Sequence, residues 1–104
     1  MPATDLYRTV LSAVAEESEI PESKILSPCR QREAVDARYV LVYLLHKRLG
    51  LYPSRINAIT GICERSINYI LTFYEQRYNQ SKFLRNIADT VSYKLRKHSE
   101  STNL

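Results

Sequence analysis

The most informative stretch of the sequence is PSRINAITGICERSINYILTFYEQRYNQ, which runs from residue 53 to residue 80. Near its start, Ile56 and Ile59 are three residues apart and therefore share one face of a short helix. Gly61 interrupts this pattern, and a longer helix follows it. The apolar stripe of that longer helix consists of Ile67, Ile70, Leu71 and Tyr74. A short helix, a glycine-containing turn of about four residues and a longer helix form the layout of a helix-turn-helix.

The residues that open the longer helix carry side chains suited to reading DNA. In a helix-turn-helix the second helix enters the major groove, and its N-terminal residues reach the base edges. Arginine commonly pairs with guanine, asparagine pairs with adenine, serine can serve either, and glutamate can accept from a cytosine amine. The alternative is that two amphipathic helices joined at Gly61 are only a packing unit. The predicted base-reading residues are Glu64, Arg65, Ser66, Asn68 and Tyr69.

Another long helix is expected upstream of this motif, from Ser27 to about Leu49. Ser27 and Pro28 form a helix-start signal, with serine at the cap and proline at the first helical position. Gly50 can take the left-handed conformation that ends a helix. The apolar surface is broad, so we expect this helix to be the central and most buried one. Its apolar residues are Val35, Tyr39, Leu41, Val42, Tyr43, Leu44 and Leu45.

Amphipathic helices are also expected at both ends of the chain. The first ends near Glu17, and the polar stretch from Ser18 to Lys24 that follows it is expected to be a connection or a single turn. Its apolar stripe must pack on the body of the same chain or on a second copy. The last helix begins after Ser81, a capping candidate, and ends in a basic turn at His98. The stripe of the first helix consists of Leu6, Val10, Leu11 and Val14.

These patterns predict an all-α protein, a single helical domain of about five helices that contains a helix-turn-helix. Residues 1–20 form the N-terminal amphipathic helix and its connection, residues 21–98 form the helix-turn-helix domain, and residues 99–104 form a flexible tail. A length of 104 residues allows one domain. The presence of only two glycines and four prolines argues against a sandwich or barrel with many turns.

Composition excludes several classes of function. No apolar run approaches the roughly 20 residues needed to span a bilayer, and the N-terminus has no signal-peptide pattern, so we expect a cytoplasmic protein. Cys29 and Cys63 are too few for a disulfide scaffold or a four-ligand zinc site. The sequence has no glycine-rich phosphate loop and no Ser/His/Asp pattern. We therefore expect no enzyme, metal, cofactor or small-molecule substrate.

Charge is unevenly distributed along the chain. The formal net charge is −3 for residues 1–27 and +7 for residues 28–104. A basic body with an acidic N-terminal arm favours a polyanionic partner for the body. The alternative is a soluble basic domain without such a partner.

The segment from about Ser27 to Tyr78 resembles the C-terminal DNA-binding domain of the bacterial replication initiator DnaA, which belongs to the helical class shared with the Trp repressor. The resemblance runs through RQREAVDARYVLVYLL at residues 30–45 and GLYPSRI at residues 50–56, and Gly61 falls on the turn glycine of the family. CERSIN at residues 63–68 takes the place of the family signature Arg-Asp-His-Ser/Thr-Thr-Val. The ATPase domain of the family has no counterpart, so the resemblance implies a stand-alone relative.

The resemblance implies three groups of DNA contacts. Arg30, Arg32 and Arg38 match the basic stretch that contacts the DNA backbone and minor groove, although Arg38 can instead face inward and pair with Asp36 or Glu33. The loop and first motif helix, whose N-terminal amides can hold a phosphate, are matched by Ser54 and Arg55. The major-groove readers of the family are matched by Glu64, Arg65, Ser66 and Asn68. The expected partner is double-stranded DNA.

A second hypothesis is a helical module that binds a protein or self-associates without binding DNA. The apolar stripe of the N-terminal helix favours it, because a second copy can cover that stripe and form a homodimer. The position of the arginines discriminates between the two hypotheses. One basic face favours DNA, whereas scattered arginines favour a protein partner.

Overall fold

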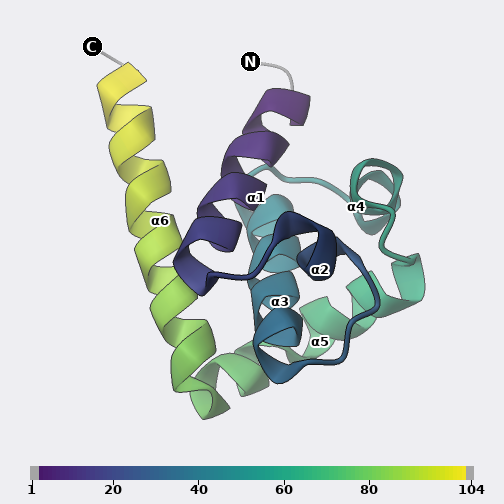
Figure 1. The fold of residues 1–104 in the computed structure, drawn as a ribbon. Coiled ribbons are helices and arrows are strands. Elements are labelled where there is room, and N and C mark those ends of the chain that lie inside the picture. The colour runs from purple at the N-terminus through teal and green to yellow at the C-terminus, as the bar shows by residue number, and fades with distance from the viewer. Residues whose placement is uncertain (1–2, 103–104) are drawn as a thin grey trace.

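The computed structural model describes the backbone of residues 3–102 and the side chains of residues 5–97. Within these residues the chain is all-α, as the sequence predicts, and has no strand. The additional element beyond the five helices expected is a five-residue helix in the predicted connection. The helices are α1 (Ala3–Ser18), α2 (Glu22–Leu26), α3 (Arg32–Lys47), α4 (Pro53–Thr60), α5 (Glu64–Gln80) and α6 (Lys82–Thr102) (Figure 1).

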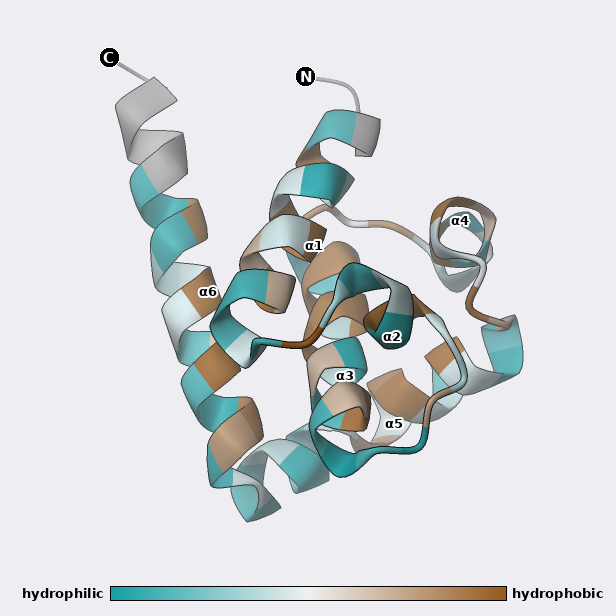
Figure 2. Ribbon diagram, viewed as in Figure 1, coloured by the Kyte–Doolittle hydropathy of each residue, from teal (hydrophilic) through white to brown (hydrophobic). Residues whose placement is uncertain are grey.

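α3 lies at the centre of the fold and contacts each of the other five helices. Apolar residues therefore cover much of its surface, which Figure 2 shows as brown turns behind α1 and α2. Leu41 and Leu45 are fully buried, and each such side chain stabilises the fold by about 1.5–3 kcal/mol. The prediction of a central, most buried helix is confirmed.

α1 packs on α3 and α6 of its own chain, so its apolar stripe does not need a second copy to cover it. Val10, Leu11 and Val14 are each 3% exposed or less. At its C-terminal end, Glu16 and Glu17 both form ion pairs with Lys94 of α6. The acidic arm is therefore joined to the C-terminal helix by charge as well as by apolar contact.

The prediction that the central helix starts at Ser27 and Pro28 is wrong, because α3 begins at Arg32. Ser27 instead ends α2, where its hydroxyl donates to the carbonyl of Lys24 at 2.9 Å. Residues 27–31 form a loop, which we call the α2–α3 loop. Arg38 holds it with hydrogen bonds to the carbonyls of Ile25 and Cys29, at 2.8 and 2.9 Å. The Cys29 N–H bonds the Ser27 hydroxyl, and the Ile25 carbonyl, which it would bond in a continuing helix, accepts from Arg38 instead.

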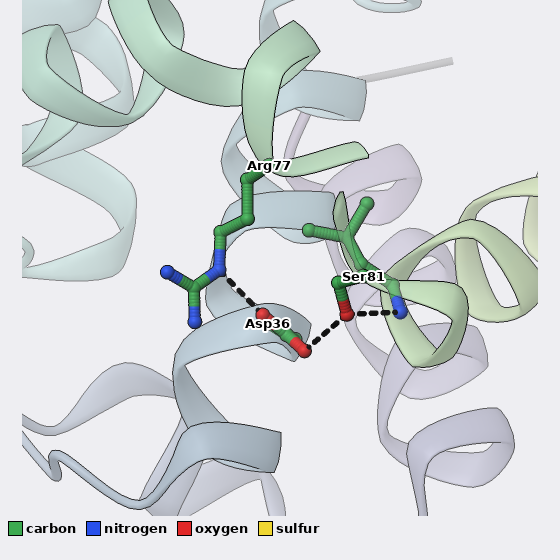
Figure 3. A network of polar contacts seen from close by, with 4 residues as sticks. Asp36, Arg77 and Ser81 are labelled. Carbon is green, nitrogen blue, oxygen red and sulfur yellow. Dashed lines mark hydrogen bonds and ion pairs between the residues drawn. The ribbon is translucent and has the colours of Figure 1, made fainter. Parts of the chain in front are cut away.

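A buried polar network joins α3, α5 and α6. Asp36 of α3 is 1% exposed and accepts hydrogen bonds from Nε of Arg77, on α5, and from the hydroxyl of Ser81 (Figure 3). The same hydroxyl accepts the backbone N–H of Leu84 at 3.1 Å. Ser81 is thus the N-terminal cap of α6, as the sequence predicts.

α6 extends beyond the predicted end at His98, and its backbone is helical to Thr102. Residues 96–102 contain no glycine or proline to stop it, so the helical pattern continues into the segment expected to be a tail. Residues 103 and 104 of that segment lie outside the described residues. None of the described helices is both long and apolar enough to cross a membrane.

Candidate nucleic-acid interface

The turn between α4 and α5 is held by hydrogen bonds among its own residues. Gly61 has φ of 81°, in the left-handed region that favours glycine, and its N–H bonds the carbonyl of Asn57 at 2.9 Å. The Thr60 hydroxyl donates to the carbonyl of Ile56 at 2.6 Å and accepts the N–H of Ile62 at 3.1 Å. The Asn57 side chain donates to the carbonyl of Ile62 at 2.8 Å. These bonds fix the direction in which α5 leaves α4.

α5 has one buried face and one exposed face. Ile67 and Ile70 are buried, and Tyr74 stacks on Tyr43 of α3 with ring centroids 3.8 Å apart. Burial raises the pKa of Tyr74, which keeps its hydroxyl neutral. All five base-reading residues predicted from the sequence lie on the exposed face, within the first two turns of α5: Glu64, Arg65, Ser66, Asn68 and Tyr69.

Cys63 caps the N-terminus of α5 and is exposed. Its sulfur lies 3.7 Å from the hydroxyl of Ser66. The backbone N–H and the hydroxyl of Ser66 lower the pKa of the Cys63 thiol. The start of the exposed face therefore carries a thiol that ionises more readily than an ordinary cysteine.

Four of the five predicted backbone-contact residues are exposed. Arg30 lies in the α2–α3 loop, Arg32 begins α3, and Ser54 and Arg55 lie in the first turn of α4. Pro53 occupies the first position of α4, where its missing N–H is not needed. These side chains are accessible to a ligand from solvent.

Arg38 is the exception, because its guanidinium is committed to the carbonyls of Lys24 and Ile25 in α2 and of Cys29 in the α2–α3 loop. Burial lowers the pKa of the Arg38 guanidinium. Its hydrogen bonds to three carbonyls hold the side chain in position. The expected alternative partners are also wrong, since Asp36 pairs with Arg77 instead. Arg38 therefore positions the loop and is not an exposed contact residue.

Two concave regions lie between α5 and the elements around the α2–α3 loop. The larger, about 670 Å³, is bordered by Pro28 and Tyr39 on one side and Arg65 on the other. The smaller, about 420 Å³, is lined by Arg30, Arg32 and residues near the end of α5. Val35 lines both. Arg30, Arg32 and Arg65 thus border adjoining regions of one face.

Two residues of α5 on the side of this face, Phe73 and Arg77, are not among the contact residues predicted from the sequence. Tyr69, Phe73 and Arg77 follow Arg65 at intervals of four residues, which places them along one row of the helix. The rings of Tyr69 and Phe73 are 4.7 Å apart, and Phe73 is 40% exposed. The four-residue spacing is visible in the sequence, but a helical stripe that includes phenylalanine is more typical of a core.

Comparison with known proteins finds no family model that matches the sequence and no curated protein with significant similarity to it. Among the residues with described side chains, no group of three or more potential ligands can hold a metal ion.

Proposed function

We propose that the protein binds double-stranded DNA and inserts the first two turns of α5 into the major groove. The observation that carries this proposal is the exposure of Arg65, Ser66 and Asn68 on a helix held from behind by buried isoleucines. The major groove is wide enough for one α-helix, and these side-chain types form specific contacts to base edges. The turn at Gly61 gives α5 a fixed orientation on α4.

The DNA backbone is contacted by residues on both sides of α5 in this proposal. Arg30 and Arg32 approach from the α2–α3 loop and the start of α3, and Ser54 and Arg55 approach from α4. Contacts to phosphates supply affinity and register, whereas contacts to bases supply sequence preference. The net charge of +7 on residues 28–104 supports the contacts to phosphates.

The resemblance to the DNA-binding domain of DnaA supports the same function. We propose that the chain is a cytoplasmic relative of that domain and acts in the control of replication or transcription. Cys63 and Arg65 differ from the family signature, so the preferred DNA site differs from that of the initiator. The base sequence that this chain prefers is then its own and is not shared with the initiator.

Binding to a random-sequence duplex of 20 base pairs, measured from 50 to 300 mM salt, tests the proposed function. Three arginines on phosphates, Arg30, Arg32 and Arg55, predict that log K falls against log salt with a slope of about −3. A Lys97→Gln variant is the matched control, because it removes one exposed charge from α6, away from the proposed interface. Its slope should equal that of the wild type. Absence of duplex binding at 50 mM salt would rule the function out.

One observation favours the rival function, a protein-binding module. Tyr69 and Phe73 form an exposed aromatic pair, and exposed apolar patches often mark protein interfaces. Sedimentation of the free protein from 10 to 500 µM tests self-association through this pair. We expect a monomer throughout, because Val10, Leu11 and Val14 of the apolar stripe of α1 are already buried within the chain.

A further inference from the structure

The smaller concave region, which we call the arginine cavity, carries more positive charge than the acidic groups beside it neutralise. It is lined by Arg30, Arg32, Val35, Arg77, Gln80 and Ser81. Asp36 is the carboxylate paired with one of the three arginines. Among the described residues, neither Arg30 nor Arg32 has a carboxylate within ion-pair distance. The cavity is therefore a concave region with an unneutralised excess of about two positive charges, which favours an anion.

Arg77 is held rigidly at the wall of this cavity. Its Nε donates to Asp36 at 2.5 Å, and its guanidinium carbon lies 4.8 Å from the ring centroid of Tyr39. Asp36 is in turn fixed by the Ser81 hydroxyl, at 2.8 Å. A side chain held in this way loses little conformational entropy when it binds a ligand.

Part of the Arg77 guanidinium remains available to a ligand. Arg77 donates from Nε to Asp36, and its side chain also forms a hydrogen bond with Tyr39, so the guanidinium has donors left over for a ligand. Figure 3 shows one terminal nitrogen directed away from Asp36 and the other beside the bond from Nε to Asp36. Two parallel N–H groups of a guanidinium match the spacing of two phosphate oxygens. The side chain is 31% exposed, so an anion can reach these groups from solvent.

We propose that this cavity binds one phosphate of the DNA backbone, with Arg77 as a preset bidentate donor and Arg30 and Arg32 closing around it. The inference rests on the proposed function. It adds a phosphate site at the far end of α5 and gives Asp36 the role of a positioning residue. Asp36 neutralises part of the charge of Arg77 but fixes where its remaining donors point.

The position of the cavity favours a DNA phosphate over a free anion. Arg77 follows Arg65 by 12 residues, about 18 Å along the helix axis. The major groove is about 12 Å wide. A helix whose N-terminal turns lie in the groove therefore brings Arg77 to the phosphates that border it, on the side where Arg30 and Arg32 also lie.

A conservative substitution separates the phosphate contact from the structural role of Arg77. Lysine in Arg77→Lys keeps a positive charge for Asp36 but has no second pair of fixed donors. We expect affinity for the 20-base-pair duplex to fall about tenfold, since hydrogen bonds to charged groups are among the stronger ones. The melting temperature should stay close to that of the wild type. Affinity unchanged within twofold, in a folded variant, would overturn the phosphate site.

NMR of the arginine side chains gives a test on the unaltered protein. The Nε and terminal nitrogen signals of Arg77 should shift during titration with the duplex, together with those of Arg30 and Arg32, while the signals of Arg8 on α1 should not. If Arg65 shifts and Arg77 does not, the phosphate site is wrong and DNA binding stands. If no arginine shifts, the proposed function itself fails. A shift of Arg77 with inorganic phosphate but not with the duplex would assign the cavity to a free anion and overturn the proposal.

Discussion

The turn between α4 and α5 and the α2–α3 loop both border the proposed interface, but different kinds of contact hold them. In the turn, every hydrogen bond joins residues no more than five positions apart, and several different groups take part. In the loop, one side chain, Arg38, reaches carbonyls between 9 and 14 positions away. The turn is thus supported by local bonds alone, whereas the loop combines local bonds of Ser27 with the long-range bonds of one side chain, Arg38.

The largest effect is expected where the long-range bonds all come from one residue. Arg38→Ala removes three hydrogen bonds to main-chain carbonyls and should lower the free energy of unfolding by about 2–3 kcal/mol. That figure is below the sum of three such bonds because part of the guanidinium faces water. Urea denaturation measures the change. Arg30→Ala, in the same loop, is the control and should change stability by less than about 0.5 kcal/mol.

A somewhat smaller effect on DNA binding should separate base contacts from backbone contacts. Arg65→Ala should cost roughly 2 kcal/mol on the preferred site and relax the sequence preference, because a bidentate base contact is worth about that. Arg32→Ala should weaken all duplexes about equally. Selection from a random duplex library compares the two variants. If the Arg65 variant selects the same site with unchanged stringency, Arg65 does not read bases.

The turn itself can be tested with a pair of glycines. Gly61 and Gly50 both have positive φ, at 81° and 68°, and an added methyl group meets no atom within 4 Å at either position. Alanine at either site should therefore lower stability by about 1 kcal/mol through backbone strain alone. Only Gly61→Ala should also weaken duplex binding, because Gly61 orients α5. Equal affinities of the two variants would show that the turn geometry does not matter for binding.

The smallest effect concerns pH. The pKa of the Cys63 thiol is lowered by Ser66, so the thiolate forms at a lower pH than in an ordinary cysteine. A thiolate at the start of α5 repels phosphates, and duplex affinity should therefore decrease slightly as pH rises through this pKa. The change is measured by titrating affinity from pH 6 to pH 9. Cys63→Ser should remove the decrease, and a decrease that persists in this variant would assign it to another group.

The same contrast between local and distant contacts explains how much of the structure can be predicted from the sequence. The helix-turn-helix and the cap at Ser81 depend on neighbouring residues, so periodicity and capping rules place them correctly. The start of α3 cannot be read in this way, because Arg38 and the carbonyl of Cys29 meet only after the chain has folded.

The candidate site shows the same limit. The exposure of Glu64, Arg65 and Asn68 follows from the helical spacing of the buried residues between them. The role of Arg77 does not, because its partner Asp36 is 41 residues away and reads in the sequence as an ordinary acidic residue of a helix. The pattern of a single sequence therefore does not show which charged residues form pairs across long distances in the chain.

The most direct test of the account is a backbone-amide NMR titration of the 104-residue protein with the 20-base-pair duplex. We expect the largest shifts at residues 64–69, with further shifts at residues 30–32 and 54–55. The amides of α1 that face α6 should not change, because that surface lies outside the proposed interface. Shifts centred on α1 and α6, with residues 64–69 unchanged, would contradict the assignment of α5 as the helix that reads DNA.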